Sequence, residues 1–202
     1  LIRALLNKIV GNVAPGIGST LTTGSYRLRL QGLTRGIKVI DTPGICEGGQ
    51  VGRLREKDAL LKASAADLIL FVVDSDLGAF EMDLISNFAA ASKRIFIALN
   101  KCDLLGHQQE EKLISLLRDR TKGLINSQDI ISTVASPQTI PQIGRKPHQP
   151  KPEIDQLIKR IAFVLHQDGE ELIADNILLQ CKNLGESGRR LLNKQRLIES
   201  KR

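Results

Sequence analysis

The sequence predicts an α/β fold built on a mostly parallel sheet with helices on both faces. Residues 68–74 and 94–100 are continuously apolar, as strands covered on both faces are. Helical patterns of apolar residues lie at 51–65, 81–92 and 110–121, so helices separate the strand candidates. Strands that alternate with helices of this length are typical of parallel sheets.

Further strands are predicted on both sides of this central region. Residues 26–31 alternate apolar and polar side chains, as a half-exposed edge strand does, and residues 37–41 follow after a short polar turn. These two runs predict a hairpin. A weaker strand candidate lies at residues 130–134.

The C-terminal third predicts a loop followed by helix. Residues 137–152 hold five of the seven prolines, which indicates a loop or linker. Asp168-Gly169 is predicted to break or bend the helix after it, with more helix from 172 to 197. The apolar side of the first part of this helix consists of Leu157, Ile161, Val164 and Leu165.

Composition narrows the class of protein. The 202 residues are 42% hydrophobic and 25% charged, enough for one domain with a core and an extension. Apolar runs are too short to span a membrane, and no signal peptide is visible. The three cysteines are far apart and lack metal-ligand spacing, so we expect a reduced, cytoplasmic protein without a cysteine metal site.

The positive charge is concentrated at the C-terminal end. Residues 179–202 carry seven Lys or Arg against two Glu, which is +5 of the total net charge of +7. Such a segment favours an anionic lipid surface or a nucleic acid. The plainer alternative is a solvated helix face.

The run Asp41-Thr42-Pro43-Gly44 follows the strand candidate at residues 37–41. A carboxylate at the end of a strand can hold the water shell of a bound Mg²⁺ ion. Gly44 has no Cβ, so its backbone N–H can approach a terminal phosphate closely. The pattern is short, and an ordinary turn containing proline is the alternative.

The run Asn100-Lys101-Cys102-Asp103 follows the buried strand at residues 94–100. Asp103 can accept hydrogen bonds from the ring N–H and the exocyclic amine of guanine, and Asn100 can contact the N7 side. The stem of Lys101 can pack on the base. Adenine presents the opposite donor pattern to Asp103, so the set would select guanine. A strand-ending turn is the alternative, but Asp41-Thr42-Pro43-Gly44 ends another strand, and both runs are expected at the same edge of the sheet.

Together these motifs resemble the G domain of Era-like GTPases, the TrmE–Era–EngA group, over residues 1–165. The resemblance implies a Ras-like P-loop NTPase fold of three layers, with GTP or GDP and Mg²⁺ as ligands. It assigns Asp41 to the Mg²⁺ shell, Gly44 to the γ-phosphate, and Asn100, Lys101 and Asp103 to guanine. It also places Ala135, in "TVASP", against the base, although Val134 replaces the usual Ser. The switch threonine on Mg²⁺ is expected at Thr23, with Thr22 as the alternative.

Two departures from the family pattern affect catalysis. The sequence has no G-x-x-x-x-G-K-[ST] phosphate loop, and "LIRALLNKIVG" resembles the helix that follows this loop. We therefore expect the first strand and the loop to precede Leu1, and this chain alone to bind GTP weakly or not at all. Ile45 replaces the glutamine that orients the attacking water in Ras-like enzymes, so no catalytic residue is identified and intrinsic hydrolysis is expected to be slow.

The predicted organisation is an N-terminally truncated G domain at 1–165 and a basic helical extension at 166–202 that leads to a further domain. The resemblance implies a GTP/GDP switch that hydrolyses GTP in the intact protein. The alternative is a non-catalytic, degenerate G domain that serves as a protein-interaction module. The partner is expected to be the cytoplasmic face of an anionic membrane, with RNA or the ribosome as the rival. A nucleotide-dependent dimer is a further alternative.

Overall fold

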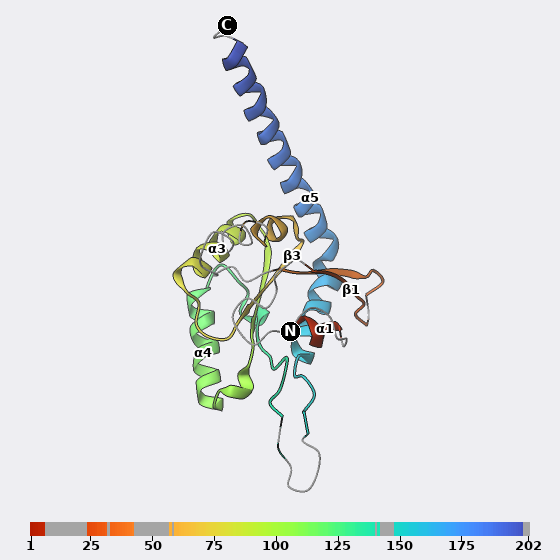
Figure 1. The fold of residues 1–202 in the computed structure, drawn as a ribbon, viewed down its shortest axis with the longest axis vertical. Helices are drawn as coiled ribbons and strands as arrows, with labels where there is room; N and C mark the ends of the chain where they lie inside the picture. Colours follow the sequence, from red (N-terminus) through yellow and green to blue (C-terminus); the bar gives the residue numbers. More distant parts are fainter. Residues whose placement is uncertain are drawn as a thin grey trace.

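The computed structural model covers all 202 residues and describes residues 1–6, 24–31, 33–42, 57, 59–139, 141 and 148–199 (Figure 1). Residues 59–65 are helical. The helices are α1 (Ile2–Leu6), α3 (Ala79–Ala90), α4 (His107–Arg120) and α5 (Asp155–Glu199), with short 3₁₀ helices η1 (Cys102–Leu104) and η2 (Ser127–Asp129). The strands are β1 (Gly24–Leu28), β2 (Ile37–Asp41), β3 (Leu68–Val73), β4 (Arg94–Leu99) and β5 (Ile130–Ser132).

Three of these strands form a parallel sheet in the order β3-β4-β5. The register pairs Val73 with Leu99 and Leu99 with Ser132, so the carboxyl ends of all three strands lie at one edge. β4 is the middle strand, and residues 95–99 are at most 2% exposed. The prediction of a buried parallel sheet from the two continuous apolar runs is therefore confirmed.

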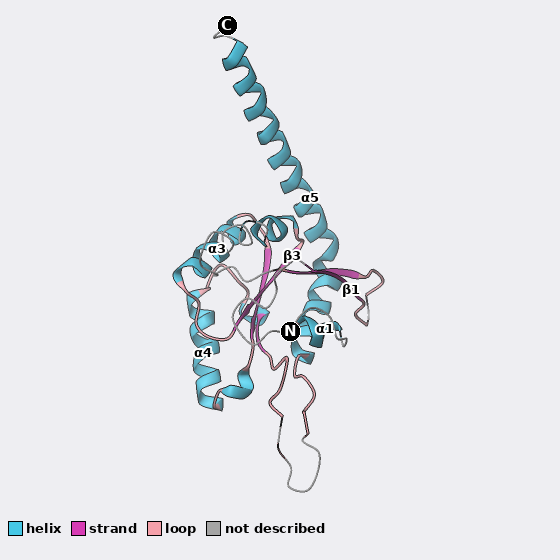
Figure 2. Ribbon diagram, viewed as in Figure 1, coloured by secondary structure: helices cyan, strands magenta, loops and turns pink. Residues whose placement is uncertain are grey.

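Helices cover both faces of this sheet (Figure 2). Ile95, Ile97 and Leu99 of β4 pack in one cluster with buried side chains of α3 and α4. The alternate residues Phe96 and Ala98 pack on the other face with buried side chains of α5. Because successive strand residues point to opposite faces, one apolar strand supplies both cores. The predicted three-layer fold is confirmed.

The predicted hairpin is present but forms its own sheet. β1 and β2 pair antiparallel from Gly24 opposite Asp41 to Leu28 opposite Ile37. The first strand lies at residues 24–28, two residues before the predicted start. Among the described strands, this hairpin has no pairing with the β3-β4-β5 sheet. A cavity of about 1410 Å³ is lined by β2 and β3, with α1 and α5 contributing to its walls.

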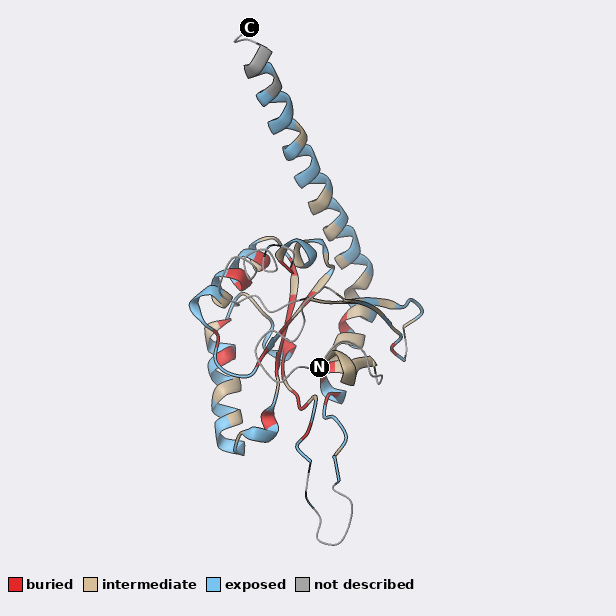
Figure 3. Cartoon of the chain, in the orientation of Figure 1, coloured by how far each residue is buried: buried red, intermediate tan, exposed pale blue. Residues whose placement is uncertain are grey.

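α5 is one continuous helix of 45 residues that begins in the core and extends past the domain (Figures 1 and 3). Leu157 and Val164 are buried, which confirms the predicted apolar side. The break predicted at Asp168-Gly169 was wrong, because contacts hold the helix to the domain beyond that point. Asn176 donates to Ala65 O and Gln180 donates to Ser64 O, which offsets a glycine cost of about 1 kcal/mol.

None of the helices in the described ranges combines the length and the apolar character needed to cross a bilayer.

The domain boundary predicted at residue 165 falls inside α5, and contacts with the domain continue to Gln180. The division into two domains stays a prediction.

Candidate functional site

The end of β4 turns sharply into the candidate site. The Asn100 N–H donates to Val73 O at 2.7 Å, which carries the strand pairing one residue past β4. Lys101 then adopts a left-handed conformation with φ of 64°, which is uncommon for a residue with a Cβ. The chain continues into η1, with Asn100 half-buried and Lys101 and Asp103 exposed. The polar side chains thus leave the buried strand within a single tight turn.

Asn100 joins this turn to the loop that follows β5. Its Oδ1 accepts a hydrogen bond from the Ala135 N–H at 3.0 Å and one from the Thr133 hydroxyl at 3.3 Å. Backbone bonds reinforce the connection, because the Thr133 N–H donates to Leu99 O and the Cys102 N–H donates to Thr133 O. The structure therefore brings together Asn100 and Ala135, two predicted site residues that are 35 positions apart.

Asp103 and Lys101 each have a partner from another segment. Asp103 Oδ2 accepts a hydrogen bond from the Gln138 N–H at 3.2 Å. Lys101 Nζ lies 2.5 Å from Oδ2 of Asp74, which follows β3. From the sequence, Asp74 reads as a helix cap or turn acceptor, so its role beside Lys101 was missed. The parallel register was the available signal, since the ends of neighbouring parallel strands meet at one edge.

Cys102 belongs to the core below the site. Its side chain is buried, and Sγ donates to Leu99 O at 3.2 Å. Burial raises the pKa of the thiol, the hydrogen bond with the Thr133 backbone opposes this, and Glu110 and Asp103 raise the pKa further. Cys102 is thus a packing residue within the motif.

Asp41 lies at the end of β2, in the hairpin sheet. It is half-buried and lines the cavity between β2 and β3 together with Thr42 and Leu1. The start of α1 and the end of β2 therefore lie near one another. Asn100 and Asp103 are not part of this cavity wall.

The structure leaves the predicted phosphate and Mg²⁺ residues untested. Asp41 and Asn100 were predicted at one edge of a sheet, but they follow strands of two different sheets, and their proximity stays a prediction. Thr22, Thr23, Gly44 and Ile45 lie outside the described residues.

The Mg²⁺ prediction depends on the chemistry of Asp41. In the described ranges, no three His, Cys, Asp or Glu side chains gather as a metal site would require. Mg²⁺ commonly keeps several waters and binds through one or two carboxylates plus substrate phosphates, without a cage of protein ligands. A single half-buried carboxylate on a cavity wall fits that mode of binding.

Comparisons with known proteins agree on the class of the chain. A family model described as "50S ribosome-binding GTPase" matches residues 1–101, which is half of the sequence. The tRNA modification GTPase MnmE of Moorella thermoacetica is 36% identical over 123 residues, which cover 57% of this chain and 25% of the relative. The chain therefore spans about a quarter of the length of this relative. Both matches agree with the resemblance read from the sequence motifs.

Proposed function

The chain belongs to the 50S ribosome-binding GTPase family, and we propose that it is the guanine-nucleotide-binding domain of a switch that alternates between GTP and GDP. In this proposal the intact protein hydrolyses GTP. The observation that carries the proposal is the link between Asn100 and Ala135, because it joins the two loops that would enclose the base. A platform fixed before the ligand arrives loses less conformational entropy on binding.

The base would be held by four residues of this platform. Asp103 accepts hydrogen bonds from the guanine ring N–H and exocyclic amine, and the Asn100 amide donates to N7. The stem of Lys101 packs along the base. The Ala135 N–H exchanges its bond with Asn100 for one with the guanine carbonyl, while the bonds from the Thr133 hydroxyl to Asn100 and from the Cys102 N–H to Thr133 O keep the two loops joined. Adenine would leave the Asp103 carboxylate without donors, which supports selection of guanine.

The phosphates would bind beside the end of β2. Asp41 would hold the water shell of Mg²⁺, Thr23 would contribute a hydroxyl ligand, and Gly44 would donate its N–H to the γ-phosphate. Mg²⁺, when bound, would neutralise charge on the phosphate oxygens. Loss of the γ-phosphate would release Thr23 and the Gly44 loop, which is the switching step.

We propose that a phosphate loop supplied by the intact protein completes the site beside Asp41. Support comes from the cavity between β2 and β3, because along that side neither strand pairs with another described strand. Support also comes from Leu1, which borders the same cavity as Asp41. The proposed G domain comprises residues 1–165, and residues 166–202 form the extension.

GTP hydrolysis would need a group other than Ile45 to orient the attacking water. An aliphatic side chain cannot accept or donate a hydrogen bond, so it cannot orient the attacking water. We propose slow intrinsic turnover that a second subunit, a monovalent cation or a partner accelerates. Fast single-turnover hydrolysis by the full-length protein, without a partner and in sodium buffer, would contradict this.

The partner of the switch is proposed to be a cytoplasmic membrane surface. RNA is the rival, because the Moorella relative is named as a tRNA modification GTPase. The charge of the last 24 residues suits either anionic partner.

The deciding experiment for the proposed function is nucleotide competition on the full-length protein. Displacement of a fluorescent GDP by GTP, GDP and ATP should give a preference for guanine of about a thousandfold or more. Removal of Mg²⁺ should weaken GTP binding more than GDP binding, because the ion would neutralise charge on the γ-phosphate that GDP lacks. If no nucleotide binds, the non-catalytic interaction module becomes the better account.

A further inference from the structure

We propose that residues 177–196 of α5 bind an anionic lipid surface as an amphipathic helix that lies in the plane of the headgroups. This inference rests on the membrane partner of the proposed function and does not require nucleotide binding. It is carried by two sides of the same helix, one apolar and one basic. We define the apolar side of α5 as Ile177, Leu178, Cys181, Leu184, Leu191 and Leu192.

The apolar side of α5 is exposed over most of its length. Its five Ile and Leu side chains are between 57% and 72% exposed, whereas a folded domain usually shelters such groups. At 3.6 residues per turn, the spacing of three, four and seven positions places them on one side of the helix. Asn176, which bonds to the domain, lies on a different side, and Gln180, which also bonds to the domain, lies at the border of the apolar side next to Leu184 and Leu191. The described part of the domain therefore leaves the apolar side open.

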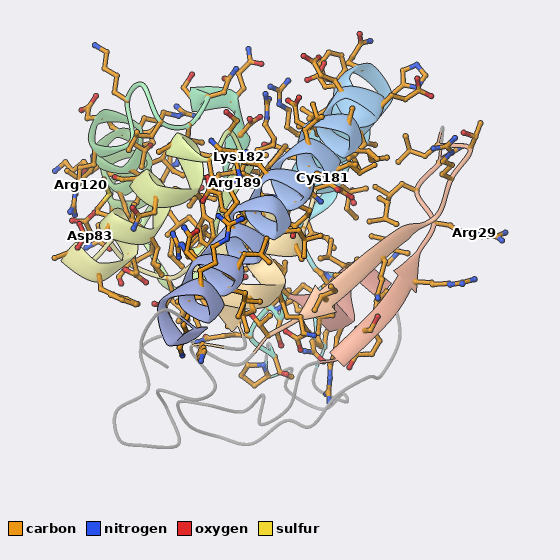
Figure 4. All side chains as sticks on the ribbon, turned by 90° about the horizontal axis from the view of Figure 1, so that it is seen from above. Arg29, Asp83, Arg120, Cys181, Lys182 and Arg189 are labelled. Atoms are coloured by element: carbon orange, nitrogen blue, oxygen red, sulfur yellow. The ribbon has the colours of Figure 1, made fainter. Side chains whose placement is uncertain are left out.

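The polar side of the same segment is basic. Residues 182–196 contain five basic residues against the single acidic Glu186, a net charge of +4. Figure 4 shows Cys181 on the flank of α5 nearer the β1–β2 hairpin, with Lys182 and Arg189 on the opposite flank. Lys and Arg side chains can lay their stems along acyl chains while their charged heads reach the phosphates. Leucines beside basic residues are the composition of interfacial helices.

The charge pattern also indicates where membrane contact begins. Residues 168–175 contain four acidic and no basic side chains, so this stretch is repelled by anionic lipid. The same stretch lies beside the domain, where α5 is held through Asn176. Contact is therefore expected only beyond Asp175, with the G domain kept off the surface.

A lipid surface fits this helix better than a second copy of the chain. Gly185 and Gly188 interrupt the apolar side, and an added Cβ at either position would meet no neighbouring atom. In a coiled coil such glycines leave cavities between the helices, because a rigid partner cannot collapse into them. Acyl chains are fluid and fill such gaps. The basic charge then adds attraction that a second basic helix would oppose.

The experiment is co-sedimentation of the 202-residue chain with lipid vesicles. Phosphatidylcholine vesicles containing about 30% phosphatidylserine should bind the chain at low salt, and neutral vesicles should bind it at least about tenfold more weakly. The double variants Leu184→Ala/Leu191→Ala and Arg189→Glu/Arg190→Glu should each weaken binding by about tenfold or more. The matched control is Leu116→Ala/Lys112→Glu on exposed positions of α4, which should bind as the parent does.

A second measurement reports which side enters the lipid. In a Cys46→Ser background, an environment-sensitive fluorophore on exposed Cys181 should shift to the blue on binding, since that side faces acyl chains. The same fluorophore on Lys182→Cys, with Cys181→Ser, should shift little. Equal shifts at both positions would contradict the proposed orientation.

Other outcomes overturn the proposal. Failure to sediment with anionic vesicles at low salt would do so directly. Concentration-dependent dimers that disappear in Leu184→Ala/Leu191→Ala would assign the apolar side of α5 to a second copy. RNA binding that needs Arg189 and Arg190 but not Leu184 and Leu191, without vesicle binding, would assign the helix to nucleic acid. None of these results would bear on guanine binding, which the nucleotide competition tests separately.

Discussion

Lys101 Nζ and Asp74 Oδ2 lie 2.5 Å apart, and this ion pair joins the turn after β4 to the end of β3. Both side chains are more than half exposed, so the pair adds little to the free energy of unfolding, at most about 1 kcal/mol. Its effect is to orient the Lys101 stem that the proposed function lays along guanine. Asp74→Asn should therefore weaken GDP binding by about three- to tenfold and leave stability nearly unchanged.

The matched control for Asp74→Asn is Asp76→Asn, whose carboxylate pairs with Arg120 at a similar exposure. Urea unfolding and GDP dissociation should be measured for both variants in the full-length protein. Equal losses of GDP affinity in the two variants would contradict a positioning role for Asp74.

Asp103→Asn should change the preferred base. An amide accepts one hydrogen bond and donates one, so it cannot take both donors of guanine. Xanthine has a carbonyl in place of the exocyclic amine, and the new N–H can donate to it. GDP affinity should fall by about a hundredfold or more, and xanthosine diphosphate should become the better ligand in the competition assay. Asp119→Asn, exposed on α4, should leave both affinities unchanged.

Replacements of Asn100 should separate its structural role from its binding role. Asn100→Ala removes the acceptor of the Ala135 N–H and the Thr133 hydroxyl, which should lower the free energy of unfolding by about 1–2 kcal/mol. Asn100→Asp keeps an acceptor oxygen, so its stability in urea should stay close to that of the parent. It should still lose guanine binding, because a carboxylate would face the N7 acceptor. An Asn100→Ala protein that unfolds like the parent would show that the link carries no energy.

Asp129 should be one of the most sensitive structural positions. It is fully buried, and Arg94 and Arg160 reach it at 2.7 and 2.8 Å. Removal of one partner of a buried ion pair commonly costs about 3–5 kcal/mol, and Asp129→Ala should destabilise the domain by about that amount. Thermal and urea unfolding should show this loss. The control Asp83→Ala, at an exposed position of α3, should change stability by less than about 0.5 kcal/mol.

Cys102 should make the free energy of unfolding fall as pH rises. Its pKa is raised in the folded state, so the folded protein keeps a thiol proton that the unfolded chain loses at alkaline pH. The contribution of the Cys102 thiol to the free energy of unfolding is complete below the ordinary thiol pKa. It is lost as pH rises through the raised pKa of the folded state. Stability should therefore fall with rising pH more steeply in the parent than in Cys102→Ala.

In a Cys46→Ser protein, iodoacetamide should modify exposed Cys181 at least about a hundredfold faster than Cys102.

The central strands and the turn after β4 were predictable because their signals are local. A strand buried on both faces needs an unbroken apolar run, and residues 95–99 supply one. The turn at Asn100 follows directly from that strand. The start of the hairpin was less predictable, since residues 24–31 keep their alternation while only residues 24–28 find a partner in β2.

The features that sequence reasoning missed depend on distant contacts. Asp74 pairs with Lys101 only because β3 and β4 lie in parallel register. The continuity of α5 past Gly169 depends on Asn176 and Gln180, whose acceptors lie more than a hundred residues earlier in the chain. Helix propensity near Gly169 contains no information on those acceptors, so it predicted a break that packing overrides.

α5 is anchored as far as Gln180 and continues without interruption to Glu199. At 1.5 Å per residue the free part is a rod of about 28 Å. A tilt of about 10° at its base would carry its tip through about 5 Å by that geometry. Lys93, the residue directly before β4, bonds to Asn176 close to this pivot. Small shifts in the sheet layer would thus become large displacements at the far end, in the manner of a lever arm.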